Sequence, residues 1–471
     1  MQLYNTLTKT IDEFVPVDGN IIRMYTCGPT VYHYAHIGNL RSYIEEDVLE
    51  KFLRYSGYDV RRVMNITDVG HLTSDADTGD DKMVRSAERE HKTVMQVAKF
   101  YTDAFFEDCR KLNIRKPDTV VPATSMIGDL IKIISVLMDK GYAYKAGPNV
   151  YFDTSKVQNY YCLTGHDESK LQVGVRDDVE EDTNKRNKAD FVLWFTKSQF
   201  EDQALKWDSP WGVGYPGWHI ECTSIAIKNL GEHLDLHCGG VDNIFPHHTN
   251  EIAQSEAYLG HPWCRHWFHV QHLNDKNGKM SKSKGNVLTV STLEEKGYDP
   301  LVYRLFCLQS HYRKPLEFDY GVMDQMANVY KKLLASVAAL SDKEAVNEEQ
   351  KAAWRQKFLD TMGMDLNTAS SLTLLYDVLK DPSLNDSTKL AVEEDFDQVL
   401  SLDLTKTRGA GGKAQDQVDD ELRAYVEARI AERKEAKKAK DFAKADAIRE
   451  ELAGKGIVIK DTRQGTVWEK A

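Results

Sequence analysis

The sequence is poor in cysteine and has no long apolar run, and each shortage excludes a class of protein. Seven of its 471 residues are cysteines, an odd and scattered set, which argues against a disulfide-stapled scaffold and for a reducing compartment. No apolar stretch approaches the roughly 20 residues that a membrane-spanning helix needs. The N-terminus lacks a basic segment followed by an apolar one, so it does not resemble a secretory signal. These shortages predict a soluble, cytoplasmic protein.

Basic side chains are also in the minority. Lys and Arg total 61 against 73 Asp and Glu, which gives a net charge of −12. Over the whole chain this balance argues weakly against nucleic acid as a partner. The segment from residue 421 to the end differs, because it carries 13 basic and 10 acidic side chains. A mildly basic end on an acidic body is compatible with a local RNA-binding module, but a solvated helix surface gives the same pattern.

The chain is too long for one domain, and its patterns change along its length. At roughly 100–200 residues per domain, its length predicts three or four units. A short apolar strand over 21–26, a polar helix over 40–56 and a second strand over 58–67 predict a βαβ unit with parallel strands. From residue 323 onward the pattern is almost wholly helical. Residues 454–468 predict a small hairpin after a last amphipathic helix.

The first cluster that can carry chemistry is MYTCGPTVYHYAHIGNLR, at residues 24–41. A strand ends at Cys27, and the tetrapeptide from His36 to Asn39 leads into a helix. Small residues such as Gly38 let the backbone approach a phosphate, while the helix N-terminus offers unpaired N–H groups and a partial positive charge. His36 and Asn39 are three residues apart, so both can face one ligand. A capped strand–helix turn with a surface histidine is the alternative.

The second cluster is KMSKSKGN, at residues 279–286. Lysines alternate with hydroxyl groups, and Lys279 and Lys282 could together neutralise the charge that develops on a departing polyphosphate. A solvated loop of lysines and serines is the alternative for such a string in isolation.

A third constellation has the composition of a metal site. Cys222, His247 and Glu251 offer a soft, a borderline and a hard zinc ligand, and Cys27 would make a fourth. His247 and Glu251 are four residues apart, hence on one face of a helix and able to share a metal. Because the sequence has no C-x-x-C pair, a buried structural cysteine beside an ordinary helical His/Glu pair is the alternative.

Taken together and in this order, the motifs resemble a known family. HIGN near the N-terminus and KMSKS some 240 residues later resemble the two signature motifs of class I aminoacyl-tRNA synthetases. A larger set of segments, collinear from the first residues to the last, looks like cysteinyl-tRNA synthetase: MYTCGPTVYHYAHIGN, NITDV, WDSPWG, PGWHIEC, FPHHTNEIAQSEA, KMSKS and KAKDFAKADAIREEL. The resemblance implies that the chain activates cysteine with ATP and transfers it to its tRNA.

The resemblance also implies a fold and its division into domains. The fold is α/β, with a Rossmann-type parallel-sheet catalytic domain split by an insertion, then an α-helical bundle and a small C-terminal α+β anticodon module. The implied ranges are 1–118 and 201–275 for the two halves of the catalytic domain, 119–200 for the insertion, 276–322 for the connective region with KMSKS, 323–405 for the bundle, 406–418 for a linker and 419–471 for the anticodon module.

A zinc ion, one per chain, is implied with an unusual role. In the family the metal takes the thiolate of the substrate cysteine as an additional ligand, and its protein ligands fall at Cys27, Cys222, His247 and Glu251. Serine is nearly isosteric with cysteine, so shape alone would discriminate by only about 1–3 kcal/mol. A soft, readily ionised thiol binds zinc far better than a hydroxyl does. The short insertion agrees with a protein that needs no editing domain.

The other site residues follow from the same carry-over. The catalytic contacts are expected at His36, Asn39, Lys279 and Lys282. ATP, bound with Mg²⁺, is expected to contact His36, Gly38, Asn39, Gly239, Asp242, Lys279 and Lys282. The amino-acid pocket is expected to include Thr67 and Trp218. The anticodon is expected at Lys437, Phe442, Asp446 and Asp461, although Phe442 is equally consistent with a buried helix residue.

Some positions depart from the family pattern or compete with it. Asn39 stands where the best-known form of the first motif has a second histidine, and Cys238 and His248 are competing donors near the expected metal. Two rival functions share these motifs. A mycothiol-type ligase joining cysteine to an amino-sugar inositol would lack the segment from 421 to 471, and a non-catalytic RNA-binding paralog would show damaged lysines or ligands. We therefore expect a monomer whose partners are the tRNA for cysteine, L-cysteine and ATP, with no membrane.

Overall fold

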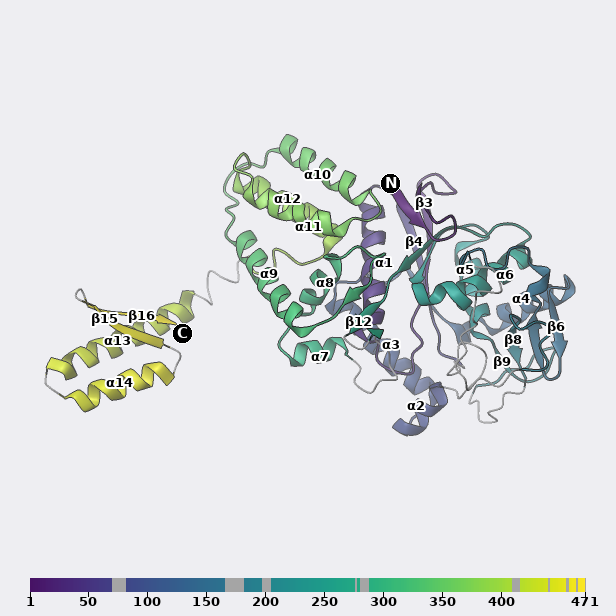
Figure 1. Cartoon of the computed structure of the whole chain (residues 1–471), viewed down its shortest axis with the longest axis horizontal. Coiled ribbons are helices and arrows are strands. Elements are labelled where there is room, and N and C mark those ends of the chain that lie inside the picture. The colour runs from purple at the N-terminus through teal and green to yellow at the C-terminus, as the bar shows by residue number, and fades with distance from the viewer. Residues whose placement is uncertain are drawn as a thin grey trace. The chain divides into compact units, whose positions relative to one another are not determined.

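The computed structural model describes most of the chain in two compact units (Figure 1). Unit 1 comprises Met1–Leu333 with Leu340–Leu404, and unit 2 comprises Leu334–Ala339 with Thr405–Ala471. The residues that the structure describes are 1–69, 82–165, 182–196, 205–275, 278–279, 288–408, 416–438, 441–454, 457–462 and 465–470.

A five-stranded parallel sheet forms the centre of unit 1. Its strands lie in the order β11-β10-β3-β4-β5. Their bounds are β3 Ile21–Thr26, β4 Asp59–Ile66, β5 Thr119–Pro122, β10 Leu234–Gly240 and β11 Cys264–Val270. From β3 the chain builds the sheet outward in one direction through β4 and β5, and later in the other through β10 and β11. The strand order therefore reverses between β3 and β10, and in such sheets ligands bind beyond the carboxyl ends of the strands at that point.

Helices surround this sheet and connect its strands. The predicted βαβ unit is confirmed, because α1 (Ile37–Tyr55) joins β3 to the parallel β4. The remaining helices of the sheet-containing part are α2 Lys82–Glu90, α3 Val94–Lys111, α4 Ile127–Asp139, α5 Trp218–Leu230 and α6 Thr249–Leu259. The helix α5 packs against α4 and α6 around buried Ile220 and Ile225, which places Cys222 in the apolar core.

The inserted region contains a second, antiparallel sheet. Its order is β6-β7-β8-β9, with β6 Ala143–Ala146, β7 Asn149–Phe152, β8 Phe191–Phe195 and β9 Tyr215–Pro216. β5 belongs to the central sheet although it follows residue 118, and β9 belongs to the inserted sheet although it follows residue 200. The boundaries expected at 118 and 200 remain predictions. In the structure, the chain leaves the central sheet after β5 and leaves the inserted sheet after β9, in both cases slightly later than these residues.

The rest of unit 1 is mainly helical. Its helices are α7 Val290–Glu295, α8 Pro300–Leu308, α9 Tyr320–Ala338, α10 Glu348–Met362, α11 Thr368–Lys380 and α12 Asp386–Leu400, and α9 extends into unit 2. Short strands complete the unit: β1 Gln2–Asn5, β2 Thr10–Glu13, β12 Leu273–Asp275, β13 Gly278–Lys279 and β14 Leu316–Glu317. Within the described ranges, no helix is long and apolar enough to cross a membrane.

Unit 2 has the small α+β form that the sequence predicts. Two helices, α13 (Asp416–Lys438) and α14 (Phe442–Gly454), precede an antiparallel hairpin of β15 (Ile457–Thr462) and β16 (Gly465–Lys470). Its core contains Val426 on α13, Ile448 and Leu452 on α14, and Ile457 on β15. The hairpin expected over 454–468 is confirmed.

Candidate functional site: four buried donors beside a nucleotide-sized cavity

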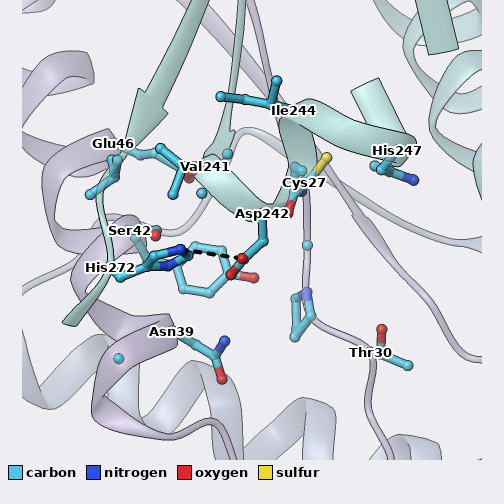
Figure 2. Close-up of a pocket in the computed structure, with 18 of the residues that line it drawn as sticks. Cys27, Thr30, Asn39, Ser42, Glu46, Val241, Asp242, Ile244, His247 and His272 are labelled. Atoms are coloured by element: carbon cyan, nitrogen blue, oxygen red, sulfur yellow. Dashed lines mark ion pairs between the residues drawn. The ribbon is translucent and has the colours of Figure 1, made fainter. Parts of the chain in front are cut away.

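A cavity of about 1160 Å³ opens at the carboxyl ends of the central strands. Residues that follow β3, begin α1 and follow β10 and β11 line its wall, among them Gly28, His36, Asp242 and His272. Figure 2 shows Cys27 and His247 at one end of this space and Asn39 at the other, with Asp242 and His272 between them. The cavity therefore lies where the reversal of strand order predicts a ligand.

The HIGN tetrapeptide is both a helix cap and part of this wall. His36 is the N-cap of α1, and its Nδ1 accepts a hydrogen bond from the Asn39 backbone N–H at 3.0 Å. The Asn39 side-chain oxygen in turn accepts from the His36 backbone N–H at 3.4 Å, which completes a capping box. Because Nδ1 of His36 is an acceptor, the proton of the neutral ring lies on Nε2. His36, Gly38 and Asn39 all line the cavity, so the cap does not exclude a contact with a ligand.

The four predicted metal ligands come together in the interior. Cys27 follows β3 and Cys222 lies in α5. His247 lies in the helical turn Ile244–His248 that leads into α6, and Glu251 lies one turn later, in the first turn of α6. One donor atom from each lies within 4.8 Å of every other, and all four residues are buried. Nε2 of His247 is 3.4 Å from Sγ of Cys222 and 3.0 Å from Oε1 of Glu251. Segments separated by up to 224 positions in sequence thus present their donors to one point.

These donors fit a zinc ion in composition and in spacing. Around a tetrahedral zinc with usual bond lengths, neighbouring ligand atoms lie about 3.4–3.8 Å apart. Oε1 of Glu251 is buried and accepts no hydrogen bond from the described residues, although it faces Nε2 of His247. A carboxylate oxygen and a ring nitrogen that face the same buried point are arranged as two ligands of one cation would be.

A second group of donors overlaps the first. Cys27 and Glu251 can also combine with His237 and His248. Nε2 of His237 lies 2.9 Å from Oε2 of Glu251, while its Nδ1 is buried with no hydrogen-bond partner in the described part of the chain. The ring therefore places its proton on Nε2 and donates it to Glu251, which makes His237 a support for a ligand.

The orientation of His247 favours the first group. Its Nδ1 lies 2.9 Å from Nδ1 of His219, so it can donate there and leave the Nε2 lone pair facing Cys222 and Glu251. The remaining competitor, His248, has Nε2 3.3 Å from Sγ of Cys27 and Nδ1 2.8 Å from Nε2 of His269. The His248 ring therefore lies between the predicted metal ligand Cys27 and His269, as a residue that supports a ligand without binding the metal does.

The electrostatics of the cluster favour a positive charge at its centre. Burial lowers the pKa of His247, but Glu251 and Cys222 outweigh it and raise the pKa to about 10. Burial raises the pKa of Glu251, but His237 and His247 outweigh it and lower the pKa to about 2. The pKa of the Cys222 thiol lies well above its ordinary value, chiefly because of burial. A divalent cation would supply this positive charge in place of the proton on His247 and would release the thiol protons.

Sequence reasoning missed the residues that hold the donors in place. His219 and His237 stand in the motifs GWHIEC and HCGG, but their contacts with His247 and Glu251 follow only from the packing of α5, α6 and β10. Gly28 was also overlooked. Its N–H donates to Oδ1 of Asn65 at 2.7 Å, and a Cβ added to it would lie 1.6 Å from the Asn65 carbonyl oxygen. The signal available in the sequence was that these histidines stand in or near the motifs that contain the predicted metal ligands.

The two residues expected around the amino acid occupy different positions. Trp218 begins α5, lines the cavity and stacks on His247 with ring centroids 4.1 Å apart. Thr67 is buried behind the wall and is not among the lining residues. Its hydroxyl donates to Oε2 of Glu221 at 2.9 Å and accepts from the Asn65 amide at 3.1 Å. Trp218 can therefore contact a ligand in the cavity, whereas Thr67 holds together the structure behind the cavity wall.

The residues expected at the nucleotide lie along the cavity between α1 and β10. Asp242 lies after β10, and its Oδ1 is 3.4 Å from Nε2 of His272 (Figure 2). Gly239 lines the cavity too, and a Cβ there would lie 2.9 Å from the ring of His248. Its lack of a side chain is thus required by histidine packing, a reason that the sequence did not indicate.

The remaining predicted residues lie partly outside the description. Lys282 lies outside the described residues, and Lys279 is described only as part of the backbone of β13. In unit 2, Lys437 on α13 and Asp446 on α14 are exposed. Phe442 begins α14 and Asp461 lies in β15, and their side chains are outside the description.

Comparisons with known proteins agree with this geometry. The family described as "tRNA synthetases class I (C) catalytic domain" matches residues 13–328, and "Cysteinyl-tRNA ligase anticodon binding domain" matches residues 419–468. The "Cysteine--tRNA ligase" of Treponema denticola is 42% identical, with 100% of this chain and 99% of that protein covered. That of Chlorobaculum tepidum is 39% identical, with 100% and 99% covered.

A solved structure shares the fold. The methionyl-tRNA synthetase of Mycobacterium tuberculosis, in complex with methionyl-adenylate, has a TM-score of 0.55 and 16% identity, with 82% of this chain and 90% of that chain covered. The predicted fold class, a Rossmann-type catalytic domain with helical and C-terminal modules, is confirmed by this likeness and by the parallel sheet. On the extent and identity of these matches, the chain belongs to the cysteine–tRNA ligase family of class I aminoacyl-tRNA synthetases.

Proposed function

We propose that the chain activates cysteine with ATP and transfers it to the 3′-terminal ribose of its tRNA. The observation that carries the proposal is the buried Cys27–Cys222–His247–Glu251 group, three of whose members line the cavity that the capped end of α1 also lines. A donor set suited to zinc, which binds thiolates, and a helix N-terminus suited to phosphates thus lie at the same cavity. Relatives named cysteine–tRNA ligase, matched along their whole length, support the same conclusion.

Zinc is the metal that we propose for the four donors. Bound there, it would supply a soft Lewis acid for the thiolate of the substrate, a contact that a serine hydroxyl cannot match. Glu251 is held by the hydrogen bond from His237, and the ring of His247 is held between Trp218 and His219. These contacts keep the donors in place before a substrate arrives.

The first chemical step forms cysteinyl-adenylate. An oxygen of the cysteine carboxylate attacks the α-phosphorus of ATP, a P–O bond forms, and the bond to pyrophosphate breaks. We assign the phosphates to the N-terminus of α1, with His36 donating from Nε2 and Gly38 and Asn39 beside it. Lys279 and Lys282, together with Mg²⁺ on the ATP, would balance the charge of the departing pyrophosphate.

The ribose and adenine lie, in this proposal, at the ends of β10 and β11. Asp242 can accept hydrogen bonds from ribose hydroxyls, and its contact with His272 orients the carboxylate. In the second step a ribose hydroxyl of the tRNA attacks the activated carbonyl carbon. The bond to the phosphate breaks, AMP leaves, and the hydroxyl proton is lost. Neither step needs a covalent enzyme intermediate, so positioning and charge stabilisation carry the catalysis.

We propose unit 2 as the part that reads the anticodon. The match of residues 419–468 to an anticodon-binding domain favours a tRNA over an amino-sugar inositol as the acceptor. Lys437 and Asp446 are exposed on neighbouring helices and could contact single-stranded bases. Phe442 and Asp461 are assigned to the same role on the family resemblance alone.

Amino-acid-dependent exchange of pyrophosphate into ATP tests this function. Exchange is expected with cysteine and not with serine, and it should disappear after chelation and return when zinc is restored. Zinc content, measured on the same samples, should follow the activity at one ion per chain. Equal exchange with serine would remove the zinc-based choice. No exchange by folded, zinc-replete protein would contradict the function itself.

A further inference from the structure

Four aromatic side chains form a partly exposed patch beside the cavity. They are His33 and Tyr34 in the loop before α1, and Phe100 and Tyr101 on α3; we call them the aromatic patch. Tyr34 and Phe100 are 36% and 41% exposed, large fractions for aromatic residues. Their ring centroids lie 6.0 Å apart, and each packs edge-on against Tyr101 at 5.1 Å. His33 stacks parallel to Tyr101 at 5.9 Å.

The aromatic patch continues the wall of the cavity outward. His33 and Tyr101 are among the residues that line the cavity, whereas Tyr34 and Phe100 lie beyond it and are exposed. A ligand that leaves the cavity past Tyr101 therefore meets two exposed aromatic rings. Large apolar side chains exposed in contact with one another often mark an interaction site.

Basic side chains lie beside the patch. Residues 82–101, which include α2 and the first turns of α3, carry five basic and two acidic side chains, whereas residues 75–81 before them carry four aspartates. Nζ of Lys92 lies 4.4 Å from the ring centroid of Phe100. Basic residues interleaved with aromatic rings are the common means of binding single-stranded nucleic acid.

The patch is also held rigidly, as a stacking platform must be. The hydroxyl of Tyr101 donates to the carboxylate of Glu90 at the end of α2, and that carboxylate also pairs with Lys92 at 3.1 Å. The helix α2 packs against α3 in the described structure. The rings consequently need little further ordering when a base stacks on them.

We propose that the aromatic patch binds the unpaired 3′-terminal nucleotides of the tRNA, with bases stacked on Tyr34 and Phe100 while the terminal ribose enters the cavity. The inference rests on the proposed function and adds to it the entry route of the acceptor. A protein partner would need a larger apolar surface than two rings supply. Bases with π-faces and phosphates with negative charge match what the patch offers.

The test compares two RNAs against two variants. The dissociation constant is measured for the complete tRNA for cysteine and for the same tRNA without its unpaired 3′ nucleotides, with wild type, Tyr34→Ala and Phe100→Ala. Each substitution is expected to weaken binding of the complete tRNA by about 5- to 100-fold, the range for losing one stacked base. Binding of the shortened tRNA should not change.

The controls separate this inference from the proposed function. Phe100→Tyr keeps a stacking ring and should bind both RNAs as wild type does, and Met364→Ala removes another exposed apolar side chain, 60% exposed, away from the patch. Cysteine-dependent exchange should be unchanged in all four variants. Equal weakening for both RNAs, or none for either, would overturn the patch assignment while leaving the function intact. Absence of exchange in wild type would instead contradict the function.

Discussion

Two of the buried groups of polar side chains in the described part of unit 1 differ in whether all their charges and polar atoms have partners within the protein. The first, the Arg304 network, joins α8 to α1. Nη2 of Arg304 is 2.7 Å from Oδ2 of Asp47, Lys51 donates to the same oxygen at 2.8 Å, and the remaining guanidinium N–H groups donate to the carbonyls of Leu400 and Leu112. Oδ1 of Asp47 accepts from the Arg115 backbone N–H at 2.7 Å. Every side-chain nitrogen and oxygen of Arg304 and Asp47 thus has at least one partner.

The second group is the donor cluster around Cys27, Cys222, His247 and Glu251. It is equally buried, yet in the described part of the chain no lysine or arginine lies within ion-pair distance of it. Its carboxylate is held ionised by imidazoles, whereas Lys51 and Arg304 outweigh burial and hold the pKa of Asp47 below its ordinary value. One oxygen of Glu251 accepts no hydrogen bond from the described residues.

The difference between the two groups distinguishes structure from function. A buried charge is costly unless it is paired and hydrogen-bonded. In the Arg304 network, ion pairs and hydrogen bonds within the protein compensate the buried charges. The network therefore needs no ligand, and its role is to join helices. The donor cluster meets it only in part, so it needs a cation from outside. Replacing a member should therefore cost mainly stability in the first group and mainly metal and activity in the second.

Cys222→Ser should show the largest effect, on activity. Loss of a direct ligand should exceed the about 10–100-fold that loss of an outer partner costs, so zinc should fall well below one per chain and cysteine-dependent exchange by more than about a hundredfold. The free energy of unfolding should fall as well, because bound zinc no longer stabilises the folded state and a serine hydroxyl is buried in place of a thiol. Metal analysis, exchange assays and urea unfolding of one preparation check the three statements.

A matched variant tests which donors hold the metal. His237→Gln alters only the overlapping group, so it should keep one zinc per chain with an affinity about 10–100-fold lower. Loss of all zinc in His237→Gln, with zinc retained in Cys222→Ser, would reverse the assignment of ligands.

Arg304→Met should show the next largest effect, on stability. Removing one member of a buried pair typically costs about 3–5 kcal/mol, because Asp47 would keep its charge with only Lys51 beside it. Lys99→Met is the control, since its ion pair with Asp103 at 2.7 Å is exposed and worth about 0–1 kcal/mol. Urea unfolding measures both. Similar losses in the two variants would mean that the network is not what joins α8 to α1.

The sequence could predict the members of the cluster but not the means by which they are held. Cys27, Cys222, His247 and Glu251 stand in recognisable motifs, and the strand–helix pattern predicts that Cys27 lies at the end of a central strand. The supporting role of His237 depends on how β10 packs beside α6, which no local pattern specifies. Arg304 and Asp47 are 257 residues apart, so their pairing follows from tertiary packing alone.

Local signals also left open which of two roles a residue takes. The tetrapeptide from His36 to Asn39 left a helix cap and a ligand contact as alternatives, and the structure shows the cap on the cavity wall. Thr67 matched a pocket position by resemblance but donates to Glu221 below the surface. Which face of a loop residue meets a cavity is decided by the neighbouring helix, here α5.

Glu45→Gln should show the smallest of these effects at pH 5, and it tests whether Glu45 belongs to the Arg304 network although it makes no hydrogen bond to it. Glu45 lies on α1 and is fully buried, with neither carboxylate oxygen hydrogen-bonded to a described residue. Burial raises its pKa from 4.5 to about 8, although Arg41 and Arg304 oppose the rise. Between these values the folded state keeps a proton that the unfolded state has lost, so wild-type stability falls as pH rises from 4.5 to 8.

The glutamine variant cannot ionise, so its stability relative to wild type should rise across that range. We expect a difference of about 1 kcal/mol at pH 5 that grows by up to about 1.4 kcal/mol per pH unit and levels off near pH 8. Urea unfolding at several pH values measures the slope, and Glu13→Gln, at an exposed carboxylate, is the matched control. A flat difference for Glu45→Gln would mean that Glu45 is ionised when folded. Arg41 and Arg304 would then neutralise its charge without hydrogen bonds. The Arg304 network would in that case include a carboxylate whose oxygens accept no hydrogen bond from the described residues.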